Sequence, residues 1–373
     1  MHVMQITTGQ ADPDGVLLYA AEAARRLAGC GHRVSMLTPP DGWISNRLSG
    51  SRVRLVPSTL DKWPLGELRR IRDDIRRHAV DVVHTHGNRA HTFGVLLRRL
   101  YGIPCVAHAH RNRQHIHWAA NDHVIAVSEA TRQHHIWTNL VLPSRITTVH
   151  NPVDTHRFCR QSPTRIADFR QELQLPQDAR LIGVLGTVRR GKGQRYAVEA
   201  MPSILKAFPE THLLIVGAEN ARYANDVRRR IEQLKIGGRV HWVPYRDDAP
   251  TVLSALDVCL VPSLEEPFGF VAPESLVCGT PVVASRVGGL QETIQHERTG
   301  LLVQPRSAAE LAAGTLRFLG DPRLASQYTS AGAAWVRSQL TPHQHFRQVT
   351  TILARVAGAL DTLSETTRAA RAG

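Results

Sequence analysis

The sequence is poor in cysteine and lysine and contains no long hydrophobic segment. None of its apolar runs approaches the roughly 18–20 residues that a membrane-spanning helix requires, and its first residues lack the basic head and apolar core of a signal peptide. The cysteines form no Cys-x-x-Cys pair, which argues against a disulfide framework or a zinc knuckle; they stand at positions 30, 105, 159, 259 and 278. We therefore expect a cytoplasmic protein with reduced thiols.

Only four lysines are present, so arginine supplies most of the positive charge. The 46 Lys and Arg exceed the 32 Asp and Glu by 14. Residues 1–160 hold 21 basic and 12 acidic residues, and 15 of the 20 histidines. This excess is compatible with a solvated basic surface, with an anionic ligand or membrane surface, or with nucleic acid. No recognised nucleic-acid motif accompanies the charge, so we expect no nucleic-acid partner.

The length of 373 residues predicts two domains, and the hydrophobic pattern supports that division. Strand-length apolar runs alternate with amphipathic helical segments twice, first over residues 2–149 and again over 181–303. A polar stretch at 161–178 separates the two series. This pattern predicts an α/β fold with two doubly wound, parallel-sheet (Rossmann-like) domains facing a ligand cleft. We expect the domains at 1–162 and 163–342, with a C-terminal helix at about 343–373 packing back on the first.

A glycine-rich segment in the second half imitates a phosphate-binding loop. It reads Gly186-Thr-Val-Arg-Arg-Gly-Lys-Gly193 and lies between an expected strand and helix. Gly193 stands where a nucleotide triphosphatase needs Ser or Thr to hold Mg²⁺, which excludes that class. The glycine turn, the helix N-terminus and the cations Arg189, Arg190 and Lys192 still favour a bound phosphate or diphosphate, although a basic loop that only caps a helix fits as well.

A second segment places two glutamates around a Pro-Phe-Gly turn. Glu266 lies on the loop after an expected strand, and Glu274 lies on a helix that we expect to begin near Gly269. Free amides near Gly269 could bind a phosphate while the carboxylates accept hydrogen bonds from sugar hydroxyls. The alternative is a solvated acidic loop.

Taken together, these motifs resemble those of the retaining glycosyltransferases of family four, which have the GT-B fold. In the second half the resemblance covers Glu266-x7-Glu274 with Pro267-Phe268-Gly269, Cys278-Gly279-Thr280-Pro281, Val287-Gly288-Gly289, Leu214-Ile-Val-Gly217, Arg239 to Asp247 and Gly300-Leu-Leu-Val303. In the first half it covers Asp81-Val-Val-His-Thr-His-Gly87, Ala126-Val-Ser128 and Asn151-Pro-Val-Asp154.

The resemblance implies transfer of a sugar from a nucleotide-diphosphate donor to a glycan or lipid-linked acceptor, without a metal or other cofactor. It implies that Lys192 holds the diphosphate, that Glu274 binds the ribose, and that Glu266 contacts the sugar beside the Phe268-Gly269 backbone. It further implies that Gly15 approaches the diphosphate and that His110 lies near the reacting sugar. The family's diphosphate-binding arginine is replaced by Thr187 here, so Arg189 or Arg190 would have to take its role.

Two further readings compete with a transferase. The loss of the arginine at Thr187 fits a non-catalytic protein that binds sugar nucleotides or glycans, and a sugar-nucleotide epimerase shares the general fold. Three His-x-His pairs, at 84/86, 108/110 and 115/117, also raise the question of a metal. No Asp or Cys completes a ligand set, so we expect no metal and place His86 and His110 in the cleft.

A basic segment at Pro64–His78 is a candidate for peripheral attachment to an anionic membrane. Leu65, Leu68, Ile71 and Ile75 share one face of the expected helix, and five arginines surround it. The alternative is a helix packed on its own sheet with its basic side in water. We therefore keep an anionic membrane surface, at the inner face of the membrane, as a candidate partner.

Overall fold

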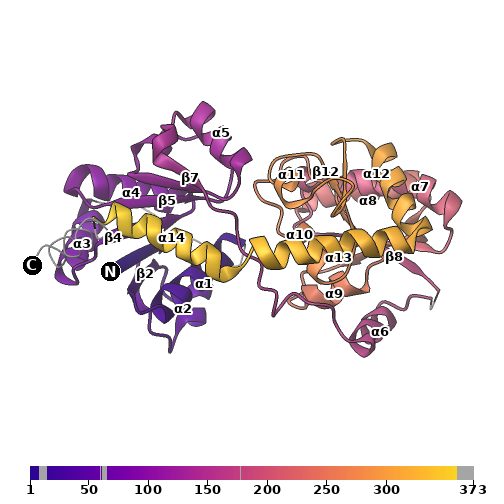
Figure 1. The fold of residues 1–373 in the computed structure, drawn as a ribbon, viewed down its shortest axis with the longest axis horizontal. Helices are drawn as coiled ribbons and strands as arrows, with labels where there is room; N and C mark the ends of the chain where they lie inside the picture. The colour runs from indigo at the N-terminus through magenta and orange to yellow at the C-terminus, as the bar shows by residue number, and fades with distance from the viewer. Residues whose placement is uncertain (8–14, 59, 61–64, 177, 359–373) are drawn as a thin grey trace, which may run out of the picture. The chain divides into compact units, whose positions relative to one another are not determined.

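The computed structural model describes residues 1–7, 15–58, 60, 65–176 and 178–358. The chain forms two compact units (Figure 1). Unit 1 comprises residues up to His150 together with those from His343 onward, and unit 2 comprises Asn151–Pro342. Each unit contains one parallel sheet with helices on both faces, as the hydrophobic pattern predicts.

Unit 1 ends earlier than the polar stretch at 161–178 suggests. The segment that follows His150 makes its hydrogen bonds within unit 2: Val153 N–H donates to the Leu340 carbonyl over 2.8 Å, and Gln161 N–H donates to Ser254 Oγ over 3.1 Å. Polar composition marks the loop, but these contacts determine which unit the loop belongs to.

The sheet of unit 1 has seven parallel strands in the order β3-β2-β1-β4-β5-β6-β7. The strands are β1 His2–Thr7, β2 Arg33–Thr38, β3 Arg54–Pro57, β4 Val82–His86, β5 Cys105–Ala109, β6 His123–Ala126 and β7 Ile146–Thr148. The helices are α1 Gly15–Gly29, α2 Trp43–Leu48, α3 Leu65–Arg77, α4 Asn88–Tyr101, α5 Glu129–Asn139 and α14 Pro342–Val356, with short 3-10 turns at Trp118–Ala120 and Pro143–Arg145.

Helices cover both faces of this sheet because its strands are apolar on both sides. On one face, α1 packs with α14, whose Val349, Ile352 and Leu353 join the core around Val82 and Val106. The yellow ribbon of α14 can be followed along unit 1 in Figure 1. Residues 359–373 of the expected C-terminal helix lie outside the described residues.

The basic helix α3 covers the opposite face of the sheet, together with α4. Leu68, Ile71 and Ile75 are buried in this core, so the apolar face of the helix is occupied by its own sheet. Leu65 remains exposed, and Pro64, its expected first residue, lies outside the described residues. The structure thus gives α3 a packing role that leaves no apolar stripe for a membrane. Within the described residues, no helix is both long and apolar enough to span a bilayer.

The sheet of unit 2 has six parallel strands in the order β10-β9-β8-β11-β12-β13. The strands are β8 Arg180–Leu185, β9 Thr211–Val216, β10 Val240–Val243, β11 Val258–Val261, β12 Val282–Ser285 and β13 Leu301–Val303. The helices are α6 Pro163–Glu172, α7 Gln194–Ala207, α8 Ala221–Gln233, α9 Ala249–Ala255, α10 Val271–Val277, α11 Leu290–Thr293, α12 Ala308–Gly320 and α13 Pro322–Gln339, with 3-10 turns at Arg190–Lys192 and Gly237–Arg239.

The strand order places the functional loops. In unit 2 the order reverses between β8 and β11, and in unit 1 it reverses between β1 and β4. Ligands of open α/β sheets bind outside the carboxyl ends of the strands at such reversal points. The glycine-rich segment follows β8 and the glutamate segment follows β11, so both sequence motifs of unit 2 lie at its reversal point.

Candidate functional site

The loop after β8 lies directly against the loop after β11. Gly193, which precedes α7, has φ +69°, and a Cβ at this position would lie 1.9 Å from the Pro262 carbonyl oxygen. The Leu264 N–H donates to the Gly191 carbonyl over 2.9 Å and joins the same two loops. Only glycine permits this close approach. The glycine that excludes a triphosphatase therefore brings the cationic loop to the glutamate loop.

Lys192 and Glu266 meet where these loops touch. Lys192 Nζ lies 2.5 Å from Glu266 Oε2, and Ser263 Oγ donates to the same oxygen over 3.2 Å. Glu266 is 8% exposed and Lys192 is partly buried. A buried carboxylate requires such a partner. A bound diphosphate would share or take over the ammonium group, because phosphate oxygens are strong acceptors.

Glu274 lies in the first turn of α10, close to the same ammonium group. Burial raises the pKa of Glu274 to about 7, and the positive charges of Arg157 and Lys192 act in the opposite direction. The carboxyl group is therefore poised between its neutral and ionised forms near pH 7. Hydrogen bonds from ligand hydroxyl groups would favour the ionised form.

Two further glycines hold the backbone that carries Glu266. The Gly289 N–H donates to the Glu266 carbonyl over 2.9 Å, and a Cβ on Gly288 would lie 2.2 Å from that oxygen. The ring of Phe268 is buried against Phe270, with ring centroids 5.1 Å apart. The side chain of Phe268 therefore packs in the core, and only its backbone is available to bind a ligand.

The predicted helix start near Gly269 is displaced by two residues. Gly269 has φ +89°, which a helix does not permit, so α10 begins at Val271 with Phe270 as its N-cap. A Cβ on Gly269 would also lie 2.5 Å from the Leu290 side chain. The turn is thus fixed between Glu266 and α11.

The structure does not select one arginine as the substitute for Thr187. Arg189 and Arg190 are both exposed, as is Thr187. The Arg189 guanidinium folds over Gly191, since a Cβ there would lie 2.8 Å from Arg189 Nη1. Both arginines belong to the turn that carries Lys192, so either can add positive charge to it.

In unit 1, histidines of β4 and β5, together with His110 directly after β5 and one histidine from α14, form a largely buried cluster. We call His84, His86, His108, His110 and His345 the histidine cluster. His86 Nδ1 lies 3.1 Å from His110 Nε2, and His84 Nε2 lies 3.3 Å from His108 Nδ1. These pairs arise because alternate residues of a strand share a face and β4 lies beside β5.

The environment keeps the histidine cluster neutral. Burial lowers the pKa of His84 and His110 to about 3 and that of His345 to about 4, and it holds the pKa values of His86 and His108 well below 6.5. Neighbouring imidazoles lower these pKa values further, because two adjacent rings resist carrying charge together. Neutral imidazoles can donate or accept hydrogen bonds.

Tyr19 of α1 packs on this cluster and bonds to its member His345 of α14. The Tyr19 hydroxyl lies 2.6 Å from His345 Nε2, and His345 Nδ1 lies 2.7 Å from the His150 carbonyl. Because a carbonyl only accepts, Nδ1 carries the proton and Nε2 accepts from Tyr19. This chain of bonds ties α14 to α1 and to the end of the first segment of unit 1.

The ring nitrogens of His84, His86 and His108 lie within 4.8 Å of one another, a spacing that could hold a metal ion. Both nitrogens of His86 are already engaged, Nδ1 with His110 and Nε2 with Gln5 Oε1 at 2.5 Å. A metal would have to replace one of these bonds. His84 Nδ1 and His108 Nε2, in contrast, are buried without a hydrogen-bond partner, so the expectation of no metal stays a prediction.

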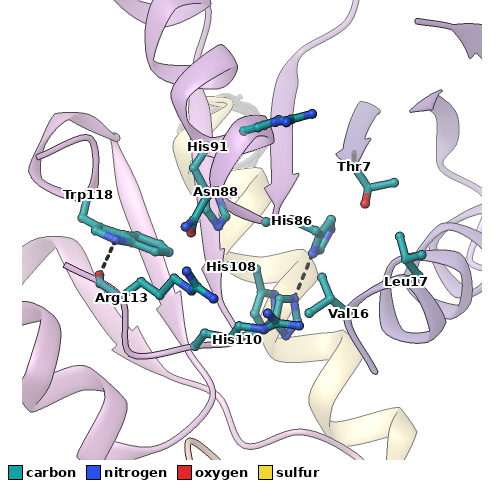
Figure 2. Close-up of a pocket in the computed structure, with 13 residues that line it drawn as sticks. Thr7, Val16, Leu17, His86, Asn88, His91, His108, His110, Arg113 and Trp118 are labelled. Carbon is teal, nitrogen blue, oxygen red and sulfur yellow. Dashed lines mark hydrogen bonds between the residues drawn. The ribbon is translucent and has the colours of Figure 1, made fainter. Parts of the chain in front are cut away.

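A cavity of about 350 Å³ opens beside the histidine cluster (Figure 2). His86, His108 and His110 form one wall, and Val16 and Leu17 of α1 form another. The described lining also includes the start of α4 and three arginines but no acidic residue; the remaining members are Thr7, Gly87, Asn88, Arg89, His91, Arg111, Arg113 and Trp118. His110 is thus placed at a polar, basic cavity, and its contact with a sugar stays a prediction.

Gly15 is the first residue of α1 and is exposed next to Val16 on this cavity. Asp14 and the loop before it lie outside the described residues. The start of α1 therefore leads into the cavity wall, while the approach of Gly15 to a diphosphate stays a prediction.

Sequence reasoning missed Arg157 and Ser263 in unit 2 and Tyr19 and His345 in unit 1. Arg157 acts on Glu274 from a segment far away in the chain, and Ser263 shares the carboxylate of Glu266. Ser263 lies inside the motif and could have been found as a polar residue three positions before the glutamate.

Comparison with known proteins gives one consistent family. A family model described as "Glycosyl transferases group 1" matches residues 165–335, and one described as "Glycosyltransferase Family 4" matches residues 13–157. The α-maltose-1-phosphate synthase of Mycolicibacterium smegmatis is 31% identical, over 68% of this chain and 73% of the relative. The D-inositol 3-phosphate glycosyltransferase of Salinispora tropica is 28% identical, over 84% of this chain and 75% of the relative.

Solved structures share the whole fold. Sucrose-phosphate synthase from Thermosynechococcus elongatus superimposes with a TM-score of 0.79 at 25% identity, covering 96% of this chain and 99% of that one. HepE from Anabaena, in complex with UDP and glucose, superimposes with a TM-score of 0.83 at 22% identity, covering 95% and 100%. The latter likeness bears on the fold alone.

Proposed function

Because this chain belongs to the group 1 glycosyltransferases of family four, with the GT-B fold, we propose that it moves a sugar from a nucleotide-diphosphate sugar to a glycan or lipid-linked acceptor with retention of configuration. The acceptor fits the synthesis of a cell-surface polysaccharide or glycolipid. The observation that carries the proposal is the meeting of Lys192, Glu266 and Glu274 at the reversal point of the unit 2 sheet.

Each of these groups has a task in the proposed reaction. Breaking the bond between sugar and diphosphate leaves negative charge on the diphosphate, and the Lys192 ammonium, with Arg189 or Arg190 on the same turn, stabilises that charge before it develops. Glu274 accepts hydrogen bonds from the ribose hydroxyls. Glu266, held by Gly288 and Gly289, contacts the transferred sugar beside the backbone of Phe268 and Gly269.

We assign the acceptor side to unit 1. The cavity beside His110 offers neutral imidazoles and arginines to a sugar or an anionic acceptor, and Gly15 stands at the start of α1 for the donor diphosphate. The fixed cations supply the charge that a metal ion would otherwise supply, so the proposed transfer is metal-independent and continues in a chelator. We propose that it takes place in the cytoplasm, at the inner face of the membrane where the acceptor is lipid-linked.

Release of nucleoside diphosphate from a panel of uridine, guanosine and adenosine diphosphate sugars tests the proposal. We expect wild-type protein to turn over one donor class and Lys192→Ala to lose about 10²–10³-fold in rate. Lys206→Ala, an exposed lysine on the last turn of α7, is the matched control and keeps full activity. Donor binding without turnover would favour the non-catalytic alternative suggested by Thr187.

A further inference from the structure

Three polar side chains link the core of unit 1 to the wall of its cavity. They are Gln5, His86 and His110, and we call them the Gln5 triad. Gln5 Oε1 lies 2.5 Å from His86 Nε2, and His86 Nδ1 lies 3.1 Å from His110 Nε2. The second of these bonds is drawn in Figure 2. Of the three residues, the proposed reaction uses only His110.

Gln5 is a polar residue in an apolar place. It lies on β1, a strand at the reversal point of the unit 1 sheet, and is 0% exposed. Its neighbours along the strand, Met4 and Ile6, belong to the hydrophobic core. Within the described residues its Nε2 has no hydrogen-bond partner, which is unfavourable for a buried donor. An apolar residue would avoid that cost, so the contribution of Gln5 is the hydrogen bond that its oxygen makes with His86.

Each imidazole of the Gln5 triad is neutral and therefore carries one ring proton. Burial lowers the pKa of His110 to about 3 and holds the pKa of His86 well below 6.5. In a neutral imidazole one nitrogen donates and the other accepts, so the role of one nitrogen fixes the role of the other. The tautomer of His86 therefore determines the tautomer of His110.

The oxygen of Gln5 sets the direction of both hydrogen bonds. A carboxamide oxygen only accepts, so His86 Nε2 carries the proton and His86 Nδ1 has the lone pair. His110 Nε2 must then donate to His86 Nδ1, and His110 Nδ1 is left with a lone pair. Turning the Gln5 amide would reverse the protons of both rings, so the tautomer of His110 shows how Gln5 is oriented.

The lone pair of His110 is available to a ligand. His110 is partly exposed and lines the cavity, and its Nδ1 makes no hydrogen bond to the described residues. The cluster nitrogens that are buried without a partner are His84 Nδ1 and His108 Nε2, so His110 Nδ1 keeps access to the cavity. A lone pair accepts a hydrogen bond from a hydroxyl group, but an ether oxygen or a fluorine offers it no proton.

We propose that Gln5 is a positioning residue, which acts through His86 and holds His110 as a hydrogen-bond acceptor for a hydroxyl group of the transferred sugar. In this state His110 has no proton on Nδ1 to give to a ligand. Its task is therefore recognition of a hydroxyl group and not proton donation. The task toward a sugar rests on the proposed function, whereas the order of protons in the Gln5 triad does not.

Nitrogen NMR of the full chain, labelled with nitrogen-15 in its histidines, tests the order of protons. The signals of His110 are identified by their loss in His110→Gln. We expect wild-type protein at pH 7.5 to carry the His110 proton on Nε2. His345 is an internal control, because its bond to the His150 carbonyl places its proton on Nδ1 independently of Gln5. A His110 proton on Nδ1 in the wild-type protein overturns the proposal.

Two substitutions separate the positioning role of Gln5 from its packing. Gln5→Met keeps the approximate size of the side chain and removes the acceptor, so we expect the His110 proton to be shared between its two nitrogens. Gln5→Glu keeps an oxygen acceptor and should restore the wild-type tautomer. An unchanged tautomer in Gln5→Met contradicts the positioning role. If a variant does not fold, the wild-type spectrum still decides the order of protons.

Donor analogues test the task toward the sugar. Each hydroxyl group of the transferred sugar is replaced in turn by hydrogen and by fluorine, neither of which can donate to His110. At one position we expect both analogues to lose about 10–100-fold in kcat/KM, and Gln5→Met to discriminate less against them there. If no position shows a discrimination that depends on Gln5, the task toward the sugar is wrong. The expected tautomer in a protein without donor turnover would keep the Gln5 triad and remove the proposed function.

Discussion

Acidification should unfold unit 1 well before unit 2, because the histidine cluster must stay neutral in the folded protein. Folding lowers the pKa of these residues, so the unfolded chain binds protons more readily, and stability falls as the pH drops below about 6.5. Each imidazole that stays neutral in the folded protein lowers the free energy of unfolding by about 1.4 kcal/mol when the pH falls from 7.5 to 5.5. His84, His86, His108 and His345 are all 0–3% exposed. Together these four residues lower the stability of unit 1 by about 5 kcal/mol, a large part of the 5–15 kcal/mol that stabilises a typical domain. Burial also lowers the pKa values of His91, His117, His123 and His135 of the same unit, so this figure is a lower bound.

Unit 2 lacks such a cluster among its described residues and should respond differently. Burial lowers the pKa of its His212 to about 4, so this residue also makes unit 2 less stable as the pH falls. The pKa of Glu274 is raised, so this residue binds its proton more readily in the folded state. Acidification to pH 5.5 therefore stabilises unit 2 through Glu274. The two effects largely offset each other.

Hydrogen exchange measured by mass spectrometry at pH 7.5 and 5.5, corrected for intrinsic rates, separates the two units. We expect peptides from β4 and β5 to lose at least about 4 kcal/mol of protection and those from β8 and β9 to lose under about 2 kcal/mol. His108→Gln should reduce the pH dependence of unit 1 by about 1.4 kcal/mol, whatever it does to the absolute stability. Equal losses in both units, or a loss in unit 1 below that of one imidazole, would refute the reasoning.

Three further predictions follow from single contacts. If the Glu274 carboxylate accepts ribose hydroxyls, nucleotide binding measured by calorimetry should be about tenfold weaker at pH 6 than at pH 8, and Glu274→Gln should remove that dependence. Gly193→Ala should abolish donor binding and destabilise the fold by about 1–3 kcal/mol in urea, because its Cβ would collide with the Pro262 carbonyl; unchanged binding would contradict the close approach of the loops. Tyr19→Phe should cost about 1–3 kcal/mol in the same assay, since it leaves His345 Nε2 buried without its donor, and a neutral effect would count against that bond.

Local patterns were sufficient for much of this structure. The alternation of strands and helices predicts both parallel sheets, and the two motifs of unit 2 identify Lys192, Glu266 and Glu274 before their contacts are known. Gly193 is the reason for rejecting a triphosphatase, and in the structure the same glycine allows the backbone to approach the Pro262 carbonyl closely. These signals share a cause, because each is contained within one loop and its neighbouring strand.

Contacts between distant segments could not be predicted in the same way. Nothing near His345 in the sequence shows that it reaches Tyr19, and nothing near Arg157 shows that it acts on Glu274. The amphipathic pattern of α3 is the same for a helix on a membrane and for one on its own sheet, and only packing separates the two. Leu140 likewise looks like an ordinary helix residue in the sequence, and only the structure shows its left-handed conformation and its exposure.

The return of the chain to unit 1 has a consequence for synthesis on the ribosome. Residues 151–342 form a continuous unit and can complete their sheet as soon as they emerge, whereas the first sheet lacks α14 until residue 356 has been made. Until then, the face that receives Val349, Ile352 and Leu353 stays uncovered, and the histidines beneath Tyr19 remain open to water. The earliest part of the polypeptide is therefore the last to mature, in reverse of the usual order of domain folding.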